Sequence, residues 1–292
     1  MKKKVRVDFF RVVLPKDAPP FSNALSQIIT DRPKEADRNR RFGDFWYRLQ
    51  RLDTVGSLST GGIVRIWMDG LPQVATLEGE FRELGLKDDE GLSDETQFIY
   101  DARYGVMVVQ RNIQAVRAST VQNYLANITG IDDLAFEVVL REDAWARVKK
   151  MKRVRTIDLG FATPTNAAAL KLLGSVGGVA DAAQYVGAAE ISVTMGMGYK
   201  KGSMNVSRVV DVARRLLRLH KQGPDEVRRV EIKGSVGFEG EPLEPIDLLD
   251  FRMVEEFIVD TPGRYLSEDA VRGGLMGAIE RRAEELQAQF AR

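Results

Sequence analysis

The chain has 292 residues, of which 44% are apolar and 29% are charged, and its 43 bases and 42 acids leave a net charge of +1. This composition is typical of a globular protein with a sizeable core. Because cysteine is absent, disulfides and thiolate metal sites are excluded. No apolar run reaches the ~18 to 20 residues of a membrane-spanning helix, and Arg6, Asp8 and Arg11 interrupt any signal-peptide core. We therefore expect a cytoplasmic protein without membrane insertion.

In the first half, apolar and polar residues mostly alternate with the period of two that a half-buried strand requires. The alternation predicts strands at residues 5–9, 45–50 and 63–68. Apolar runs at 98–101 and 106–110 flank Gly105, which predicts a hairpin because glycine tolerates the positive φ of a tight turn.

Two further features complete the first half. Residues 78–95 are acidic and contain three glycines, which predicts a solvated excursion with at most a short helix. Residues 120–128 place their apolar side chains on one helical face, and Gly130 supplies a stop just beyond the end.

The second half alternates helical and extended patterns. We expect helices at 142–150, 167–173, 180–186 and 206–221, and strands at 154–161 and 191–195. Asn205 can cap the helix at 206–221, and Gly223-Pro224 ends it. Residues 227–238 and 246–259 are predicted to pair as a long hairpin, and Ser267 followed by two acids starts a final helix.

Together these elements predict an α+β protein. A strand-rich N-terminal domain of residues 1–146 precedes a basic α/β domain of residues 147–292, which contains the long hairpin and an acidic C-terminal helical segment. The final helix carries three glycines, each with a penalty of ~1 kcal/mol relative to alanine: Gly273, Gly274 and Gly277. Such a helix indicates close packing against another element or subunit, and we expect a homodimer.

Charge is sorted along the chain. Residues 147–221 hold fourteen Lys or Arg and four Asp or Glu, whereas residues 69–101 hold ten acids and two bases. A polyanion-binding face requires such sorting. The densest part is 147–155, where six bases in nine residues repel one another unless a counter-ion is close. That counter-ion is either phosphate or an acidic surface of the same protein, for which residues 78–95 are a candidate.

The predicted helix at 206–221 separates two faces. Its apolar residues recur at i, i+3, i+4 and i+7, which puts five bases on the opposite side: Arg208, Arg214, Arg215, Arg218 and Lys221. Cations near a helix C-terminus complement the dipole and need no ligand. Asp211 is the only acid in this helix to balance the five bases, however, so we favour the interpretation that the basic face binds a polyanion. Tyr199-Lys200-Lys201, between two glycines, is a second candidate for phosphate contacts.

Several enzyme classes find no support. The glycines from Gly196 to Gly202 follow a strand, but the third is one residue late for a dinucleotide fingerprint. The glycine-rich residues 56–62 lack the lysine of a P-loop. His220, the only histidine, has no partner at triad spacing and is interpreted as a surface or capping residue. We therefore expect no catalytic residue, metal ligand or cofactor.

A metal-dependent nuclease is the runner-up hypothesis. Asp225 followed by Glu231-Ile-Lys233 imitates the acid, acid-x-lysine pattern of such enzymes, whose Mg²⁺ needs both carboxylates within a few ångströms. In a strand, Asp225 and Glu231 would lie roughly 20 Å apart. The hypothesis therefore requires the fold to bring another acid to Glu231 and Lys233, such as Asp247 or Asp250 across the hairpin.

The order of elements resembles a known family. The resemblance starts from the blocks Ala169-Leu-Lys-Leu-Leu-Gly174, Ala188-Ala-Glu-Ile-Ser-Val193 and Tyr199-Lys200-Lys201 and the helix at Val206. They resemble the family of the lambda phage exclusion protein RexA and, more loosely, KwaB-type subunits of the Kiwa antiviral system. The hairpin at Gly105, the helix containing Gln122-Asn123-Tyr124-Leu125 and the strand after Lys152 extend the likeness over most of the chain. The resemblance implies a dimeric, non-enzymatic DNA-binding component of bacterial or prophage defence with a partner protein, and transfers no catalytic residues.

We therefore predict sequence-nonspecific DNA binding through backbone phosphates, because nothing resembles a base-reading helix. The predicted contacts, assigned from charge, are Lys149, Lys150, Lys152, Arg153, Arg155, Lys200, Lys201, Arg208, Arg214, Arg215 and Arg218. A non-catalytic scaffold that binds an acidic protein through the same segment is the other alternative.

Overall fold

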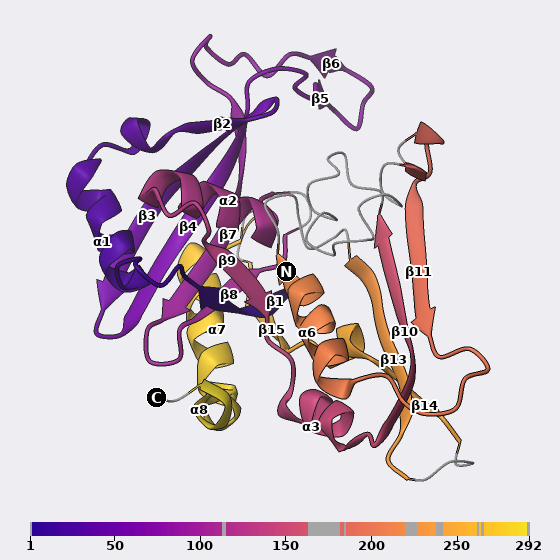
Figure 1. Cartoon of the computed structure of the whole chain (residues 1–292). Coiled ribbons are helices and arrows are strands. Elements are labelled where there is room, and N and C mark those ends of the chain that lie inside the picture. Colours follow the sequence, from indigo (N-terminus) through magenta and orange to yellow (C-terminus); the bar gives the residue numbers. More distant parts are fainter. Residues whose placement is uncertain are drawn as a thin grey trace.

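A computed structural model describes residues 2–112, 115–162, 182–183, 185–219, 227–237, 242–261, 263 and 266–290. The helix predicted at 167–173, most of that at 180–186, His220 and Asp225 lie outside the described residues. The described elements form two main antiparallel sheets with helices packed against them (Figure 1). The predicted α+β class is confirmed.

The larger sheet has the strand order β12-β9-β1-β8-β7-β4-β3-β2, and β15 also pairs with β1. Its strands are β1 (Lys2–Val13), β2 (Arg40–Phe42), β3 (Phe45–Val55), β4 (Leu58–Trp67), β7 (Leu92–Asp101), β8 (Val106–Gln110), β9 (Ala135–Val138), β12 (Arg218–Leu219) and β15 (Val254–Asp260). Gly105 makes the β7–β8 turn with a φ of 64°, as predicted. Successive side chains of a strand point to opposite faces, so buried Phe9 and Phe10 belong to two different hydrophobic clusters.

Helices cover both faces of this sheet (Figure 1). They are α1 (Phe21–Asp31) and α2 (Ala118–Thr129) on the face of Phe10, and α7 (Glu268–Arg281) and α8 (Ala283–Phe290) on the face of Phe9. Gly130 ends α2 with a φ of 71°, as predicted. The final helix is interrupted at Arg282 and forms two pieces, α7 and α8.

The smaller sheet has the order β11-β10-β13-β14. Its strands are β10 (Arg153–Ala162), β11 (Glu190–Gly196), β13 (Val227–Ser235) and β14 (Glu244–Asp247). The helix α6 (Val206–Leu217) packs on one face, over buried Ile157 and Ile232, and α3 (Glu142–Lys150) packs against α6. Because α6 also contacts β9, the helix lies between the two sheets (Figure 1).

Two predictions need correction. The helix predicted to reach residue 221 ends at Leu217, since Arg218 and Leu219 pair as β12 with β9. The long hairpin holds for its first half, where β13 pairs with β14. After a 3₁₀ turn (Leu248–Phe251), however, β15 pairs with β1. Alternation of apolar residues predicts a strand but not its partner, because either sheet accepts the same pattern. The division at residue 146 stays a prediction.

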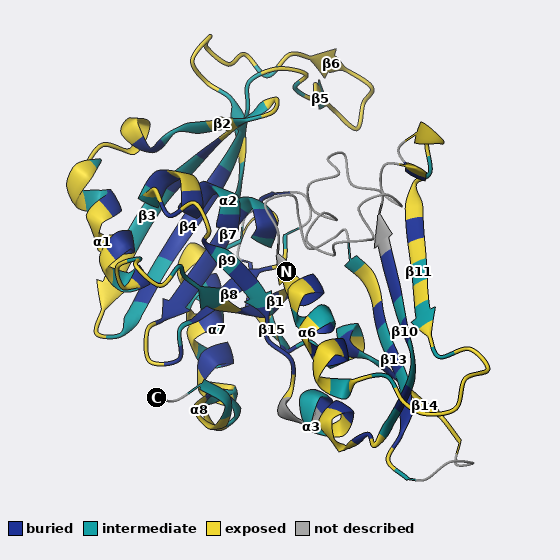
Figure 2. Ribbon diagram, in the orientation of Figure 1, coloured by how far each residue is buried: buried dark blue, intermediate teal, exposed yellow. Residues whose placement is uncertain are grey.

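The predicted acidic excursion projects from the larger sheet between β4 and β7. We call residues 69–91 the acidic arm. It contains a small ladder of β5 (Val74–Ala75) and β6 (Phe81–Arg82), and β7 begins at Leu92, within the predicted excursion. All residues from 75 to 83 are exposed, and Figure 2 shows the arm coloured accordingly. The prediction of a solvated segment is confirmed for this part.

Candidate nucleic-acid interface

The eleven bases predicted to contact DNA lie on α3, α6, β10 and β12 and on the segments that precede β10 and α6. Three line one surface groove: Lys149, Arg214 and Arg218. Six lie at the end of α3, on its link to β10, at the first residue of β10, on the loop before α6 and in the first turn of α6: Lys150, Lys152, Arg153, Lys200, Lys201 and Arg208. Arg215 is exposed on α6, and Arg155 lies on β10. The structure therefore gathers only part of the predicted set into one concave surface.

This groove, which we call the basic groove, has a volume of about 460 Å³. Its charged and aromatic lining consists of Arg11, Glu137, Trp145, Lys149, Arg214, Arg218 and Phe290. These residues come from β1, β9, α3, α6, β12 and α8, so the groove lies where the helix pair meets the larger sheet. Because Arg11 and Phe290 belong to the first strand and the last helix, residues from the two ends of the chain meet here.

Strand register sets a row of three charges along one wall. Glu137 of β9 is opposite Arg11 of β1 on one side and opposite Arg218 of β12 on the other. The Arg218 Nε atom lies 3.6 Å from Glu137 Oε2. One carboxylate therefore stands between two guanidinium groups, and directly opposed residues of antiparallel strands interact in this way.

Aromatic rings position two of the arginines. The guanidinium of Arg214 lies 5.2 Å from the ring centroid of Trp145, and that of Arg11 lies 5.5 Å from the ring centroid of Phe290. Cation–π contacts restrain a guanidinium while leaving its charge intact. Gln289 Nε2 donates to the carbonyl of Leu140 at 3.1 Å, which fixes the end of α8 at the groove.

Positive charge dominates the groove. Among the described lining residues, Arg11, Lys149, Arg214 and Arg218 are opposed by Glu137 alone, an excess of three positive charges. A concave surface lined by one sign of charge concentrates counter-ions of the opposite sign. Planar guanidinium groups are suited to phosphate because they donate two parallel hydrogen bonds.

Arg155 has a structural role. Its guanidinium donates to the carbonyls of Gly198, Lys200 and Gly202 at 2.6, 2.5 and 3.2 Å. These bonds fix the loop that precedes α6 and hold Lys200 beside it. Asn205 then caps α6, as predicted, by accepting from the backbone N–H of Arg208 at 3.1 Å.

The sequence left open whether the acidic residues 78–95 neutralise the basic residues 147–155 within one molecule. In the described part of the chain, the ion pair of the acidic arm joins Lys87 to Glu90, both inside the arm. In Figure 1 the arm lies at the top of the molecule, whereas α6 lies in the middle and α3 at the bottom. Among the described residues, the arm therefore does not neutralise the basic segment of its own chain.

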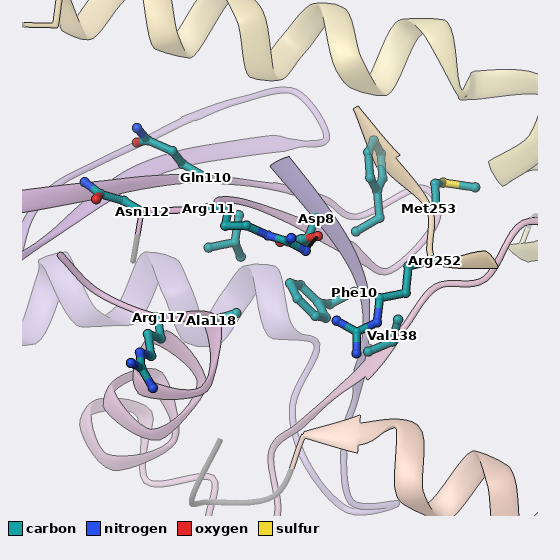
Figure 3. Close-up of a pocket in the computed structure, with 12 residues that line it drawn as sticks. Asp8, Phe10, Gln110, Arg111, Asn112, Arg117, Ala118, Val138, Arg252 and Met253 are labelled. Atoms are coloured by element: carbon teal, nitrogen blue, oxygen red, sulfur yellow. Dashed lines mark hydrogen bonds and ion pairs between the residues drawn. The ribbon is translucent and has the colours of Figure 1, made fainter. Parts of the chain in front are cut away.

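A second, smaller cavity of about 160 Å³ is lined by residues of β1, β8, β9 and the start of α2 (Figure 3). Its arginines, Arg111, Arg117 and Arg252, were not predicted from the sequence. Arg111 makes a bidentate contact with Asp8, in which Nε lies 2.7 Å from Oδ2. This ion pair compensates one charge, so the cavity is less electropositive than its three arginines imply.

A polar row crosses the face of the smaller sheet opposite α6. Register places Glu231 between Asp158 and Asp247 of the two neighbouring strands. Lys233 Nζ lies 2.9 Å from Glu231 Oε1 and 3.2 Å from Asp158 Oδ2. The Thr194 hydroxyl donates to Asp158 at 2.6 Å. We call these side chains of Asp158, Glu231, Lys233 and Asp247 the polar row.

The polar row shifts two pKa values. Hydrogen bonds to Glu231 and Asp158 raise the pKa of Lys233. Partial burial acts to raise the pKa of Asp158, but hydrogen bonds from Thr194 and Lys233 outweigh it, and the pKa falls below its ordinary value. Asp247 accepts from the backbone N–H of Leu249 at 2.9 Å and so caps the following turn. Among the described residues, no three His, Asp or Glu side chains are arranged to hold a metal ion.

Four of the seven charged and aromatic groove residues were not predicted from the sequence: Arg11, Glu137, Trp145 and Phe290. Arg11 lies in a strand more than a hundred residues from the basic segment, and Trp145 and Phe290 read as ordinary apolar residues of helices. No local signal distinguishes them, since only the pairing of β1 with β9 and the packing of α8 bring them to the groove.

Within the described residues, no helix is long and apolar enough to cross a bilayer. A comparison with the curated proteins returns no match. The sequence profile of a family of unknown function (DUF6731) matches residues 1–273. Because this match spans most of the 292 residues, the chain belongs to that family.

Proposed function

We propose that this protein binds DNA through backbone phosphates at the basic groove, with little sequence preference. The proposal rests on the convergence of four cations on one concave surface: Arg11, Lys149, Arg214 and Arg218. Among the described lining residues, Glu137 is the one that carries a carboxylate. Cations attract phosphates at any sequence, and base discrimination requires side chains that reach base edges. The exposed side of α6 adds Arg208 and Arg215, which lie seven residues apart on one stripe with Asp211 between them.

The bases outside the groove extend the same field. Lys150, Lys152, Lys200 and Lys201 are exposed around the start of β10 and the loop before α6. The loop adjoins β10 because the Met204 N–H donates to the carbonyl of Val154 at 2.9 Å. A phosphate backbone held in the groove can continue toward these lysines.

The salt dependence of binding tests this proposal. Each neutralised phosphate contributes a slope of about −0.9 to a plot of log affinity against log salt, so four contacts lower the affinity by roughly two orders of magnitude between about 50 and 200 mM salt. Fluorescence anisotropy with duplex, single-stranded and RNA probes, with and without EDTA, measures this directly. Binding that does not change with salt would rule out phosphate recognition.

The role in antiviral defence remains a proposal that rests on the resemblance to RexA-like and KwaB-like proteins. It predicts that expression of the chain in a bacterial host lowers phage plaque formation. Reversal of the groove charges by Lys149→Glu and Arg214→Glu should abolish that protection. Equal plaque numbers with and without the wild-type chain would remove this role and leave DNA binding untouched.

A metal-dependent nuclease is the second candidate, and the register of the smaller sheet favours it. The requirement that the fold bring another acid to Glu231 and Lys233 is met by Asp158, whose carboxylate lies 3.2 Å from Lys233 Nζ. Magnesium commonly uses only one or two carboxylates and keeps several waters. The polar row nevertheless lies on the opposite face of the smaller sheet from α6 and the groove, so DNA held in the groove does not reach it.

Plasmid cleavage separates the two candidates. A nuclease cuts plasmid with Mg²⁺ or Mn²⁺, loses the activity in EDTA, and loses it again in Glu231→Gln and Lys233→Met. Lys4→Met is the matched control, because Lys4 forms an ion pair with Glu256 in the larger sheet. Cleavage that persists in both row variants would assign the activity elsewhere.

A further inference from the structure

The acidic arm exposes apolar side chains that need a partner. Leu77 and Phe81 are 109% and 72% exposed. They belong to a hairpin whose ladder contains only two residue pairs, Val74 with Arg82 and Ala75 with Phe81. A two-stranded hairpin is marginally stable in water unless it packs against another surface. The structure of the arm therefore favours a docked state.

The chemistry of the arm complements that of the basic groove. Residues 69–91 contain seven acids and two bases, and Glu78, Glu80 and Glu83 near the tip are exposed. The groove has an excess of positive charge and also presents the rings of Trp145 and Phe290. Opposite charge steers the two surfaces together, and the aromatic rings can cover the apolar tip.

The arm does not reach the groove of its own chain. It leaves the larger sheet between Trp67 and Leu92. Strand register places Arg11 of β1 opposite Val106 of β8, and Val106 opposite Asp101 of β7. Asp101 is nine residues along β7 from Leu92, where the arm ends. At ~3.3 Å per residue this separates the base of the arm from Arg11 by about 30 Å. In Figure 1 the arm stands at the top of the molecule with α6 and α3 below it, and the described lining of the groove contains no arm residue, so we assign a docked arm to another copy.

We infer that two copies of this chain associate by placing the acidic arm of each in the basic groove of the other. A two-fold axis makes the two contacts identical and closes the assembly. The arm then occupies the surface that the proposed function assigns to phosphates, so self-association and DNA binding compete. This inference shares the groove with the proposed function, but the association itself requires no nucleic acid.

Mixing charge-reversed chains in sedimentation velocity tests the exchange. The arm variant carries Glu78→Lys, Glu80→Lys and Glu83→Lys, and the groove variant carries Lys149→Glu and Arg214→Glu. We expect wild type to form a dimer at low salt that dissociates at high salt. Each variant alone should associate roughly a hundredfold more weakly, since like charges then face each other. An equimolar mixture should regain a dimer, because the reversed arm fits the reversed groove.

Matched controls and DNA binding make the outcome decisive. Lys34→Glu with Arg41→Glu changes as many exposed bases at the far edge of the larger sheet and should dimerise like wild type. A wild type that stays monomeric at all concentrations, dimers in both reversed variants, or a mixture of folded variants that stays monomeric would overturn the inference. If salt-sensitive DNA binding persists in a monomeric wild type, only this inference fails. If dimers form but DNA is not bound, only the proposed function fails.

Discussion

The basic groove and the polar row are both built from charged residues that strand register brings together, yet their charge balance differs. In the groove, Glu137 stands between Arg11 and Arg218. Two further cations, Lys149 and Arg214, line the groove, and no other carboxylate is among its described lining residues. In the row, Lys233 contacts Glu231 and Asp158 at once. The row therefore pairs its one cation with two carboxylates and, with three carboxylates to one lysine, keeps an excess of negative charge, whereas the groove keeps an excess of positive charge that an anionic ligand can neutralise.

Strand register sets this difference. In the groove, register places opposite charges directly across from one another, and such a pair contributes roughly 0.2–1 kcal/mol to stability. In the row, register opposes three carboxylates, which is destabilising, and Lys233 on the same face offsets that repulsion. An uncompensated cluster of like charges costs free energy in the unliganded protein and releases it when an anion binds. We therefore expect substitutions in the groove to change binding and substitutions in the row to change stability.

The largest effect is expected from reversing the groove charges. Lys149→Glu with Arg214→Glu should weaken DNA binding at low salt by roughly a hundredfold or more, because two attractive contacts become repulsive. Fluorescence anisotropy measures the change. Lys34→Glu with Arg41→Glu is a matched control, since Arg41 also lies over a tryptophan ring, 5.9 Å from that of Trp46. Equal losses in the two double variants would mean that net charge, and not the groove, decides binding.

A smaller change of opposite sign is expected from neutralising the arm. Glu78→Gln, Glu80→Gln and Glu83→Gln should raise the DNA affinity severalfold at low salt, because the arm then competes less well for the groove. The control neutralises three exposed acids elsewhere: Asp17→Asn, Glu35→Gln and Glu280→Gln. If both triple variants gain affinity equally, a general charge effect explains the result.

Removing the lysine of the row should leave DNA binding within about twofold of wild type, since the row and the groove lie on opposite sides of the smaller sheet. Lys233→Met leaves the carboxylates of Glu231 and Asp158 facing each other without a cation, so the midpoint of thermal unfolding should fall. Circular dichroism and anisotropy on the same sample separate the two effects. A loss of binding with an unchanged midpoint would contradict the assignment of the row to stability.

The smallest effect is a pH dependence from Asp158. Its pKa is lowered in the folded protein, so its ionised form stabilises the fold at pH values above its ordinary 3.8, and this contribution disappears as the pH falls through the folded value. The difference in unfolding midpoint between wild type and Asp158→Asn should therefore be constant near neutral pH and shrink in acid. A difference that grows on acidification would show that another group dominates.

Local features of the fold were accessible from the sequence because their causes are local. Asn205 caps α6, Gly130 ends α2 in the left-handed conformation, and Gly105 turns the hairpin between β7 and β8. Each depends on a few neighbouring residues and their allowed dihedral angles. The apolar stripe of α6 was likewise predicted, and it is buried between the two sheets.

The site was only partly predictable. The charge sorting pointed to Lys149, Arg214 and Arg218, which do line one groove. It also pointed to Arg155, which instead holds the loop before α6. Gly274, expected at a tight contact, packs against the ring of Phe257 in the same chain, which explains this glycine without a second subunit. Charge along a sequence does not reveal whether a side chain faces solvent or a neighbouring carbonyl.

By itself, the sequence determined α2, α3, the start of α6, the start of α7, the turns and the segregation of charge, because periodicity, glycine and capping residues act within a few positions, whereas α1 was not predicted. Only the tertiary structure decided that β15 joins β1, that Arg11 and Phe290 complete the basic groove, and that Asp158 stands beside Glu231. These pairings join residues tens to hundreds of positions apart. Many partners satisfy the same alternating pattern, and the packing of the whole core selects among them.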